Sequence, residues 1–127
     1  MPDESERPVY RLAAWDEQQR VVDFVNAHFD WKLPLINRSE WFRYYYCGER
    51  LQFAVAERGG RLLAAVGYIP ASRSASPDLW ASVWVAERGA NGVGLELMAA
   101  LPGLTGARVL ACNNIRANTC VLYRFLG

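Results

Sequence analysis

The sequence has few of the residues that bind metals. Its 127 residues include one histidine and three cysteines. Cys47, Cys112 and Cys120 do not have the close spacing of metal ligands, and an odd number of thiols cannot all form pairs. We therefore predict no metal site. Since residues 1–8 are acidic and polar, unlike a secretory signal, we expect reduced thiols in a cytoplasmic protein.

An excess of one charge and a long apolar run are also absent. Fourteen lysines and arginines against thirteen aspartates and glutamates give a net charge of +1. This balance argues against the basic face that nucleic acid or anionic lipid would require. No apolar run reaches the roughly 20 residues that a membrane-spanning helix needs. The partner that we expect is a small molecule or a protein.

What is present is an ordinary globular composition, with 52% hydrophobic and 21% charged residues. A chain of this length suits one domain, and we predict a flexible tail over residues 1–8 and a single domain over residues 9–127. Residues 9–14 are typical of a first strand. Residues 15–30 carry a helical apolar stripe, with Asp16 placed to cap it. Pro34 then predicts an extended break.

A second helix and a hairpin follow. Ser39 with Glu40 opens a helix that Gly48 is expected to end. Residues 51–57 and 61–69 are β-type runs joined by "RGG", a typical hairpin signal.

The second half alternates strands and helices. After a polar loop over 72–78, the pattern predicts a strand over 79–87, a helix over 93–101, a strand over 107–113 and a helix over 117–126. The expected order is β-α-α-β-β-β-α-β-α. This order indicates an α/β (α+β) domain whose mixed, mostly antiparallel sheet has helices on both faces.

The junction of strand and helix at "WVAERGANGVGLELM" is rich in glycine. The first N–H groups of a helix have no partner within it, and the helix dipole makes that end partly positive. Gly92 and Gly94 remove side chains that would obstruct an approaching phosphate, and Gly89 with Asn91 tolerates positive φ. The turn therefore indicates an anion site made of main chain.

The alternative is that these glycines only form the turn. No Gly-Lys-Ser/Thr follows them, so the segment is not a Walker loop. "GANGVG" also lacks the G-x-G opening of a dinucleotide fingerprint.

Three features together resemble the GCN5-related N-acetyltransferase (GNAT) superfamily. They are the order of elements, the "RGANGVG" turn after the fourth strand, and "LYRFLG" in the last helix. The resemblance covers about residues 9–127. "DLWASVWV", "GVGLELMAAL" and "EWFRYYY" also look like a subgroup associated with bacterial polysaccharide biosynthesis, whose expected substrates are nucleotide-linked amino sugars.

The resemblance implies acetyl-CoA as co-substrate and a small-molecule amine as acceptor. Tyr123 matches the family tyrosine that protonates the leaving thiolate. Asn118 is a further cofactor-binding candidate, because the family often has an asparagine seven residues before that tyrosine, where Arg116 stands here. The strand around Val83, Trp84 and Val85 would bind the pantetheine arm. The main chain of Asn91, Gly92, Val93, Gly94 and Leu95 would hold the pyrophosphate.

The sequence departs from the family pattern at several positions. In the family register the first position of the turn is Gly89, not Arg88, so a basic side chain on the phosphate is not expected. The subgroup tends to have a histidine where Leu33 stands. The chain stops at Gly127, before the two strands that family members normally add, so the domain is expected to be incomplete there. An open sheet edge would favour self-association, which size-exclusion chromatography at high concentration would test.

Few other residues suggest catalysis. Glu57, Asp78 and Glu87 are carboxylates that could take a proton from an amine, but each suits a solvated strand end equally. His28 is expected to be structural. The aromatic residues of the first two helices and their loop could line an acceptor pocket or simply pack in the core; they are Trp31, Trp41, Tyr44, Tyr45 and Tyr46.

The leading hypothesis is an acyl-CoA-dependent N-acyltransferase in which the amine attacks the thioester directly. One alternative is a non-catalytic module of the same fold that binds acyl-CoA or protein. Another is a nucleotide-phosphate binder that uses the same glycine turn.

Overall fold

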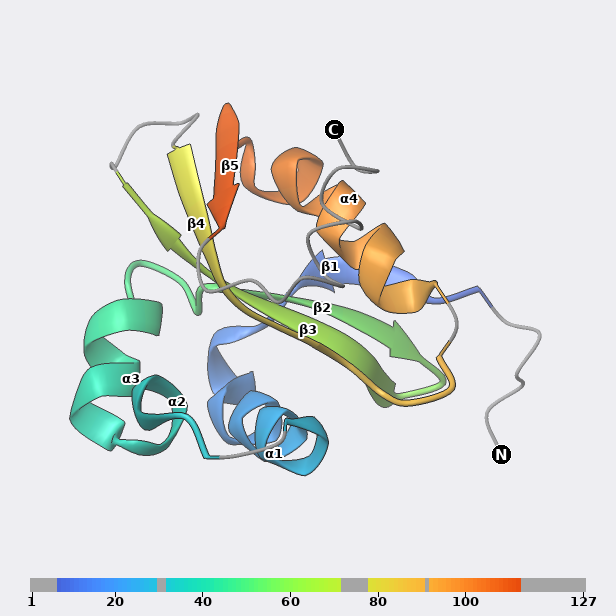
Figure 1. Cartoon of the computed structure of the whole chain (residues 1–127), viewed down its shortest axis with the longest axis horizontal. Coiled ribbons are helices and arrows are strands. Elements are labelled where there is room, and N and C mark those ends of the chain that lie inside the picture. The colour runs from blue at the N-terminus through green and yellow to red at the C-terminus, as the bar shows by residue number, and fades with distance from the viewer. Residues whose placement is uncertain (1–6, 30–31, 72–77, 91, 113–127) are drawn as a thin grey trace.

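A five-stranded mixed sheet forms the centre of the computed structural model in Figure 1, which describes residues 7–29, 32–71, 78–90 and 92–112. The strands lie in the order β1-β2-β3-β4-β5. Neighbours run antiparallel except β4 and β5, which are parallel. The strands are β1 Val9–Leu12, β2 Phe53–Arg58, β3 Arg61–Pro70, β4 Asp78–Ala86 and β5 Val109–Cys112.

Helices cover both faces of this sheet (Figure 1). On one face lie a 3₁₀ turn, η1 Trp15–Glu17, and the helices α1 Gln18–His28, α2 Pro34–Asn37 and α3 Ser39–Tyr46. On the other face lies α4 Val93–Thr105. This arrangement confirms the predicted α/β (α+β) class. The order of elements through β5 also agrees with the prediction, except that η1 and the short helix α2 are additional. The predicted last helix, residues 117–126, and most of the predicted tail lie outside the described residues.

The β2–β3 hairpin forms where the sequence predicted it. Gly59 and Gly60 have φ values of 60° and 79°, the positive values that a tight hairpin turn requires. Arg58 pairs with Arg61 across this turn.

Two local predictions were wrong. Asp16 does not cap the first helix: α1 follows Glu17 with no side-chain hydrogen bond at its start, and the Glu17 carboxylate accepts the Ala14 N–H of the preceding turn η1 at 2.7 Å. The segment around Pro34 is not extended, because α2 begins at Pro34. Proline suits the first position of a helix, and its restriction falls on the preceding residue, Leu33, whose ψ is 130°. Helix α3 ends at Tyr46 with Cys47 as its C-cap, so Gly48 follows the helix where the sequence predicted a stop; the main chain of Cys47 bridges to Leu51.

Helix α4 is longer than predicted. Pro102 lies inside it and removes one N–H donor, yet the helix continues to Thr105. The Thr105 hydroxyl donates to the Leu101 carbonyl at 2.8 Å. Gly106, with a φ of 74°, then ends the helix and donates its N–H to the Pro102 carbonyl.

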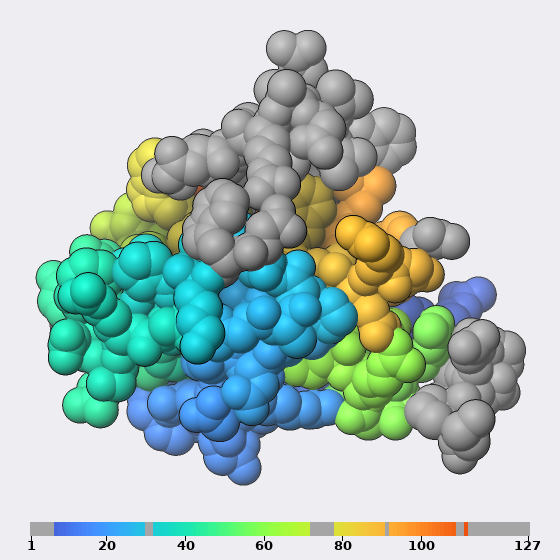
Figure 2. All heavy atoms as spheres, turned by 60° about the horizontal axis from the view of Figure 1, so that its bottom comes forward, coloured from blue at the N-terminus to red at the C-terminus, as the bar shows by residue number. Residues whose placement is uncertain are grey.

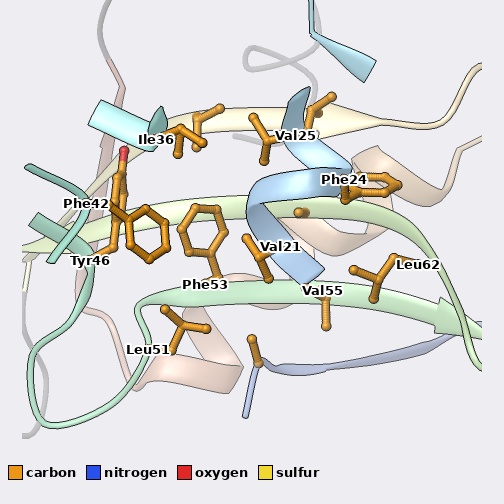
Figure 3. Close-up of a cluster of buried hydrophobic side chains, with 14 residues drawn as sticks. Val21, Phe24, Val25, Ile36, Phe42, Tyr46, Leu51, Phe53, Val55 and Leu62 are labelled. Carbon is orange, nitrogen blue, oxygen red and sulfur yellow. The ribbon is translucent and has the colours of Figure 1, made fainter. Parts of the chain in front are cut away.

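Each face of the sheet has its own hydrophobic core. Between the sheet and α1–α3, the rings of Phe42, Tyr46 and Phe53 lie side by side (Figure 3), with centroids 4.9–6.1 Å apart. Between the sheet and α4, Leu97 and Leu101 are fully buried. Helices therefore pack on both faces of the sheet, and the packing of α4 on the sheet determines the position of α4 relative to β4.

A charged network closes one edge of the α1–α3 core. Glu17 pairs with Arg11 at 2.6 Å and with Arg20 at 2.8 Å, and both arginines also reach Glu57. Hydrogen bonding from Arg11 is the main cause that lowers the pKa of Glu17 from 4.5 to about 2. Partial burial opposes this shift, and Arg20 and the Ala14 N–H add to it.

This network predicts a pH-dependent contribution to stability. Because the pKa of Glu17 is lower in the folded state, its contribution is complete above pH 4.5 and is lost as the pH falls towards 2. We expect Glu17→Gln to remove about 1–3 kcal/mol of unfolding free energy at pH 6 and much less at pH 2.5. Urea unfolding at the two pH values measures the difference. Glu49→Gln, at an exposed carboxylate outside the network, is the control; equal losses in both variants would contradict the assignment.

Candidate functional site

The glycine-rich turn connects the end of β4 to the start of α4. It begins at Glu87, whose N–H donates to the Leu63 carbonyl at 2.8 Å, and it ends at Gly92. Within it, the Ala90 N–H donates to the Glu87 carbonyl at 3.1 Å. These bonds tie the turn to β3 and fix the direction in which α4 starts.

Two glycines of this turn are required by the backbone. Gly89 has a φ of 90° and Gly92 a φ of 76°, values that other residues adopt only with strain. A Cβ atom on either glycine would meet nothing within 4 Å. Among the described residues, none therefore blocks the approach to the main chain at Gly92.

Gly94 has a different role from the predicted one. It is buried, and a Cβ there would lie 3.0 Å from Ala86 Cβ and 3.4 Å from Trp84 Nε1. The Trp84 indole donates to the Gly94 carbonyl at 3.0 Å. Gly94 therefore allows α4 to pack closely on β4, and its side is not available to a ligand.

The first turn of α4 contains main-chain donors without a partner in the described ranges, although the Val93 N–H donates to the Ala90 carbonyl at 3.3 Å. The Gly94 and Leu95 N–H groups have no hydrogen-bond partner among the described residues, and no side chain caps the helix. In the same turn, the Glu96 carboxylate accepts a hydrogen bond from the Tyr10 hydroxyl. Burial, followed by this bond and the charge of Glu96, raises the pKa of Tyr10 to about 12. The first turn of α4 is thereby attached to β1.

Strand β4 is paired with β5 over only part of its length. The pairing ends at Ala81 with Cys112, while β4 continues to Ala86. No described residue pairs with the β5 side of β4 beyond that point. In Figure 1, β5 accompanies only the first part of β4. Within the described ranges, the part of β4 that leads to the glycine turn therefore has no partner strand on this side.

A β-bulge lies where this part of β4 begins. Gly67 pairs with Val83 and Tyr68 with Ala81, so Ser82 is the extra residue on β4. After the bulge, Val83 and Val85 pack in the core under α1–α3, whereas Trp84 faces α4. Of these three predicted cofactor residues, the two valines have buried side chains, so only their main chain is available to a ligand.

A buried tyrosine supports the bulge. The Tyr46 hydroxyl lies 2.6 Å from Ser82 Oγ, and the Ser82 hydroxyl donates to the Gly67 carbonyl at 3.2 Å. Burial raises the pKa of Tyr46, and the bond to Ser82 opposes that rise. The sequence analysis missed this pair, because no spacing links residues 46 and 82.

Three of the predicted site residues cannot be placed. Asn91, Asn118 and Tyr123 lie outside the described residues. Val93 is buried against the sheet and Leu95 is half-buried. The structure therefore brings together the main chain of residues 92–95 and the second half of β4, and the roles of the other three residues stay predictions.

The carboxylates considered as proton acceptors are all ion-paired. Glu57 pairs with Arg11 and Arg20. Asp78 pairs with Arg108, and Glu87 pairs with Arg61. His28 is exposed on α1, with its ring centroid 4.6 Å from that of Phe24. In the part of the chain that the structure describes, no cluster of His, Cys, Asp or Glu side chains could hold a metal ion.

The helices in the described ranges are too short or too polar to span a lipid bilayer.

The aromatic residues predicted as a cluster divide into two groups. Tyr46 belongs to the core, whereas Trp41, Tyr44 and Tyr45 line a surface groove on α3. Trp31 lies outside the described residues.

No family model matches the sequence, and neither does any curated protein. Solved structures do match it. The chain is similar to the aminoglycoside N-acetyltransferase AAC(6')-Iy in complex with CoA, with a TM-score of 0.69 and 13% identity, over 100% of this chain and 91% of that chain. It is also similar to a polyamine N-acetyltransferase of Drosophila melanogaster, with a TM-score of 0.71 and 16% identity, over 95% and 82% of the two chains.

A third similar structure is Naa50 of Arabidopsis thaliana in complex with a bisubstrate analogue of CoA. The TM-score is 0.69 at 8% identity, over 94% of this chain and 82% of that chain. These matches do not test self-association, which stays a prediction. At such low identities the likeness concerns the fold alone, and this chain has the fold of these N-acetyltransferases.

Proposed function

We propose that this protein is an acyl-CoA-dependent N-acetyltransferase that acetylates a small-molecule amine. The observation that carries the proposal is that, among the described residues, the second half of β4 has no strand beside it on the β5 side and leads into a glycine turn at the start of α4. Support also comes from the shared fold, since one similar structure is a complex with CoA and another a complex with a CoA bisubstrate analogue.

In this proposal the main chain binds the acetyl-CoA substrate. The Val93 N–H already donates to the Ala90 carbonyl at 3.3 Å, so within the predicted cradle of residues 91–95 the other N–H groups hold the pyrophosphate, which suits the positive dipole end of a helix. The main chain of Val83, Trp84 and Val85 hydrogen-bonds the pantetheine arm along the β5 side of β4. Gly92 lets the phosphate approach the backbone, and Gly94 keeps α4 close to β4.

The reaction is direct attack. The amine nitrogen forms a bond to the thioester carbonyl carbon, the carbon–sulfur bond breaks, and the CoA thiolate leaves with the bonding electron pair. The nitrogen loses one proton to solvent, and the thiolate gains one from Tyr123, the residue proposed for that role. Catalysis then depends on positioning and on N–H groups that polarise the carbonyl.

The acceptor class is proposed from the similar structures and the sequence. The titles of two of them name aminoglycoside and polyamine N-acetyltransferases. The resemblance to the polysaccharide-associated subgroup adds nucleotide-linked amino sugars as the third class to test.

A continuous assay of thiol release tests the proposal. We expect steady release of CoA from acetyl-CoA when an aminoglycoside, a polyamine or a nucleotide-linked amino sugar is supplied, together with the acetylated amine. Binding of acetyl-CoA without turnover of any of the three classes would instead favour a non-catalytic module. Glu57 supports that alternative: burial raises its pKa, but hydrogen bonds from Arg20 and Arg11 outweigh this effect and lower the pKa, which makes Glu57 a poorer proton acceptor.

A further inference from the structure

A solvent-open groove with aromatic walls lies on α2 and α3. Its volume is about 430 Å³, and its described lining residues are Leu35, Glu40, Trp41, Tyr44 and Tyr45. We call it the α3 groove. In Figure 2, α3 (teal) forms one end of the face on which α1 and α2 also lie.

The aromatic side chains that line the groove are not part of the hydrophobic core. Helix α3 already buries Phe42 and Tyr46 against the sheet (Figure 3). Trp41, Tyr44 and Tyr45 lie on its other side and are 40%, 82% and 37% exposed. The Tyr44 and Tyr45 rings meet edge to face, with centroids 5.0 Å apart. Exposed aromatic side chains gathered in one groove are typical of a binding surface rather than of a solvated helix face.

The charges at the groove indicate which ligand it suits. The Glu40 carboxylate is exposed and forms no ion pair with any described residue. The Arg38 guanidinium lies 4.8 Å from the centroid of the Trp41 ring without lining the groove. The indole therefore already holds one cation from outside the groove. The electron-rich faces of tryptophan and tyrosine attract organic cations, and a nearby carboxylate adds to that attraction.

We infer that the α3 groove binds the ammonium group of a small organic molecule, with Trp41 and Tyr44 against the cation and Glu40 as its counter-charge. The site is separate from the glycine turn and does not depend on acetyl transfer. An aromatic groove that only packs apolar groups would bind neutral and charged ligands equally, so charge is the property to test.

The experiment compares choline with 3,3-dimethylbutan-1-ol, its neutral isostere, by titration calorimetry on the intact chain. We expect choline to bind with a Kd on the order of 1–10 mM, and about tenfold more tightly than the neutral alcohol. Equal affinity for the two ligands would overturn the inference. The absence of detectable choline binding at about 50 mM choline, which is about 50 times the lower limit of the expected Kd, would also overturn it.

Variants locate the site. Glu40→Gln and Tyr44→Leu change exposed side chains, so the fold should persist, and we expect each to weaken choline binding about threefold or more. The matched controls are Glu49→Gln and Trp15→Leu, which change an exposed carboxylate and an exposed aromatic outside the groove. Choline binding that survives both groove variants, or that falls equally in the controls, would place the site elsewhere and overturn the inference.

Discussion

Gly92→Asp is expected to weaken acetyl-CoA binding by about 30-fold to 100-fold, because it places a carboxylate where the proposed pyrophosphate lies. The fold should tolerate this change. Aspartate adopts positive φ more readily than most residues, its Cβ would meet nothing within 4 Å, and a negative charge at a helix N-terminus is favourable. Titration calorimetry with acetyl-CoA measures the effect.

Two control variants separate charge from strain. Gly92→Asn has the same shape and backbone strain without the charge, so we expect it to bind acetyl-CoA more tightly than Gly92→Asp does. Gly106→Asp adds the same charge at nearly the same φ, 74° against 76°, but at the other end of α4. That end lies about 20 Å away, beyond the distance at which salt screens surface charges. Unchanged affinity in Gly92→Asp would show that the turn does not hold the pyrophosphate.

The second large effect is expected at Tyr46. Tyr46→Ala removes a buried ring that packs on Phe42 and Phe53, and we expect a loss of about 3–5 kcal/mol of unfolding free energy. Tyr46→Phe keeps the ring and removes only the hydroxyl next to Ser82, so its expected loss is about 0.5–1.5 kcal/mol. Urea unfolding of both variants separates the packing of the ring from its hydrogen bond.

A double-mutant cycle tests whether the Tyr46 hydroxyl interacts with Ser82 at the bulge. Tyr46→Phe and Ser82→Ala each break the same hydrogen bond from opposite sides. We expect a coupling of about 1 kcal/mol between them, since the double variant loses that bond only once. Additive losses would mean that the two hydroxyl groups do not interact in solution.

Local signals in the sequence were sufficient for the elements whose ends have distinct turn chemistry. Gly59 and Gly60 identified the hairpin because a tight turn needs positive φ at two successive residues. The start of α4 was predicted from its glycines for the same reason. The interpretation of Pro34 was wrong. Proline disfavours a helical conformation at the residue before it, but proline itself can be the first residue of a helix.

The register of β4 could not be predicted from its pattern. Leu79, Ala81, Val83 and Val85 alternate regularly, which predicts one common face. In the structure the first two face α4 and the last two face α1–α3, because the bulge at Ser82 reverses the alternation. A bulge is determined by pairing between strands, and no signal for it is present in the strand itself.

The candidate site was predicted only in part, because some of its contacts also form between segments that are distant in the sequence. Gly92 is exposed and has positive φ, which fits its place in the turn, and its predicted role beside a phosphate stays a prediction. The role of Gly94 depends on Trp84 and Ala86, which approach it only after α4 has packed on β4. Contacts between distant segments, such as that of Tyr46 with Ser82, have no counterpart in local sequence spacing.

Thermal unfolding with and without acetyl-CoA tests the central claim most directly. At about 100 times its Kd, a ligand that binds only the folded state adds about 2.7 kcal/mol, which corresponds to a rise in Tm of at least about 5 °C. We predict such a rise with acetyl-CoA and none with ATP at the same concentration. No rise with acetyl-CoA, or an equal rise with ATP, would contradict the proposal that β4 and the glycine turn form an acetyl-CoA site.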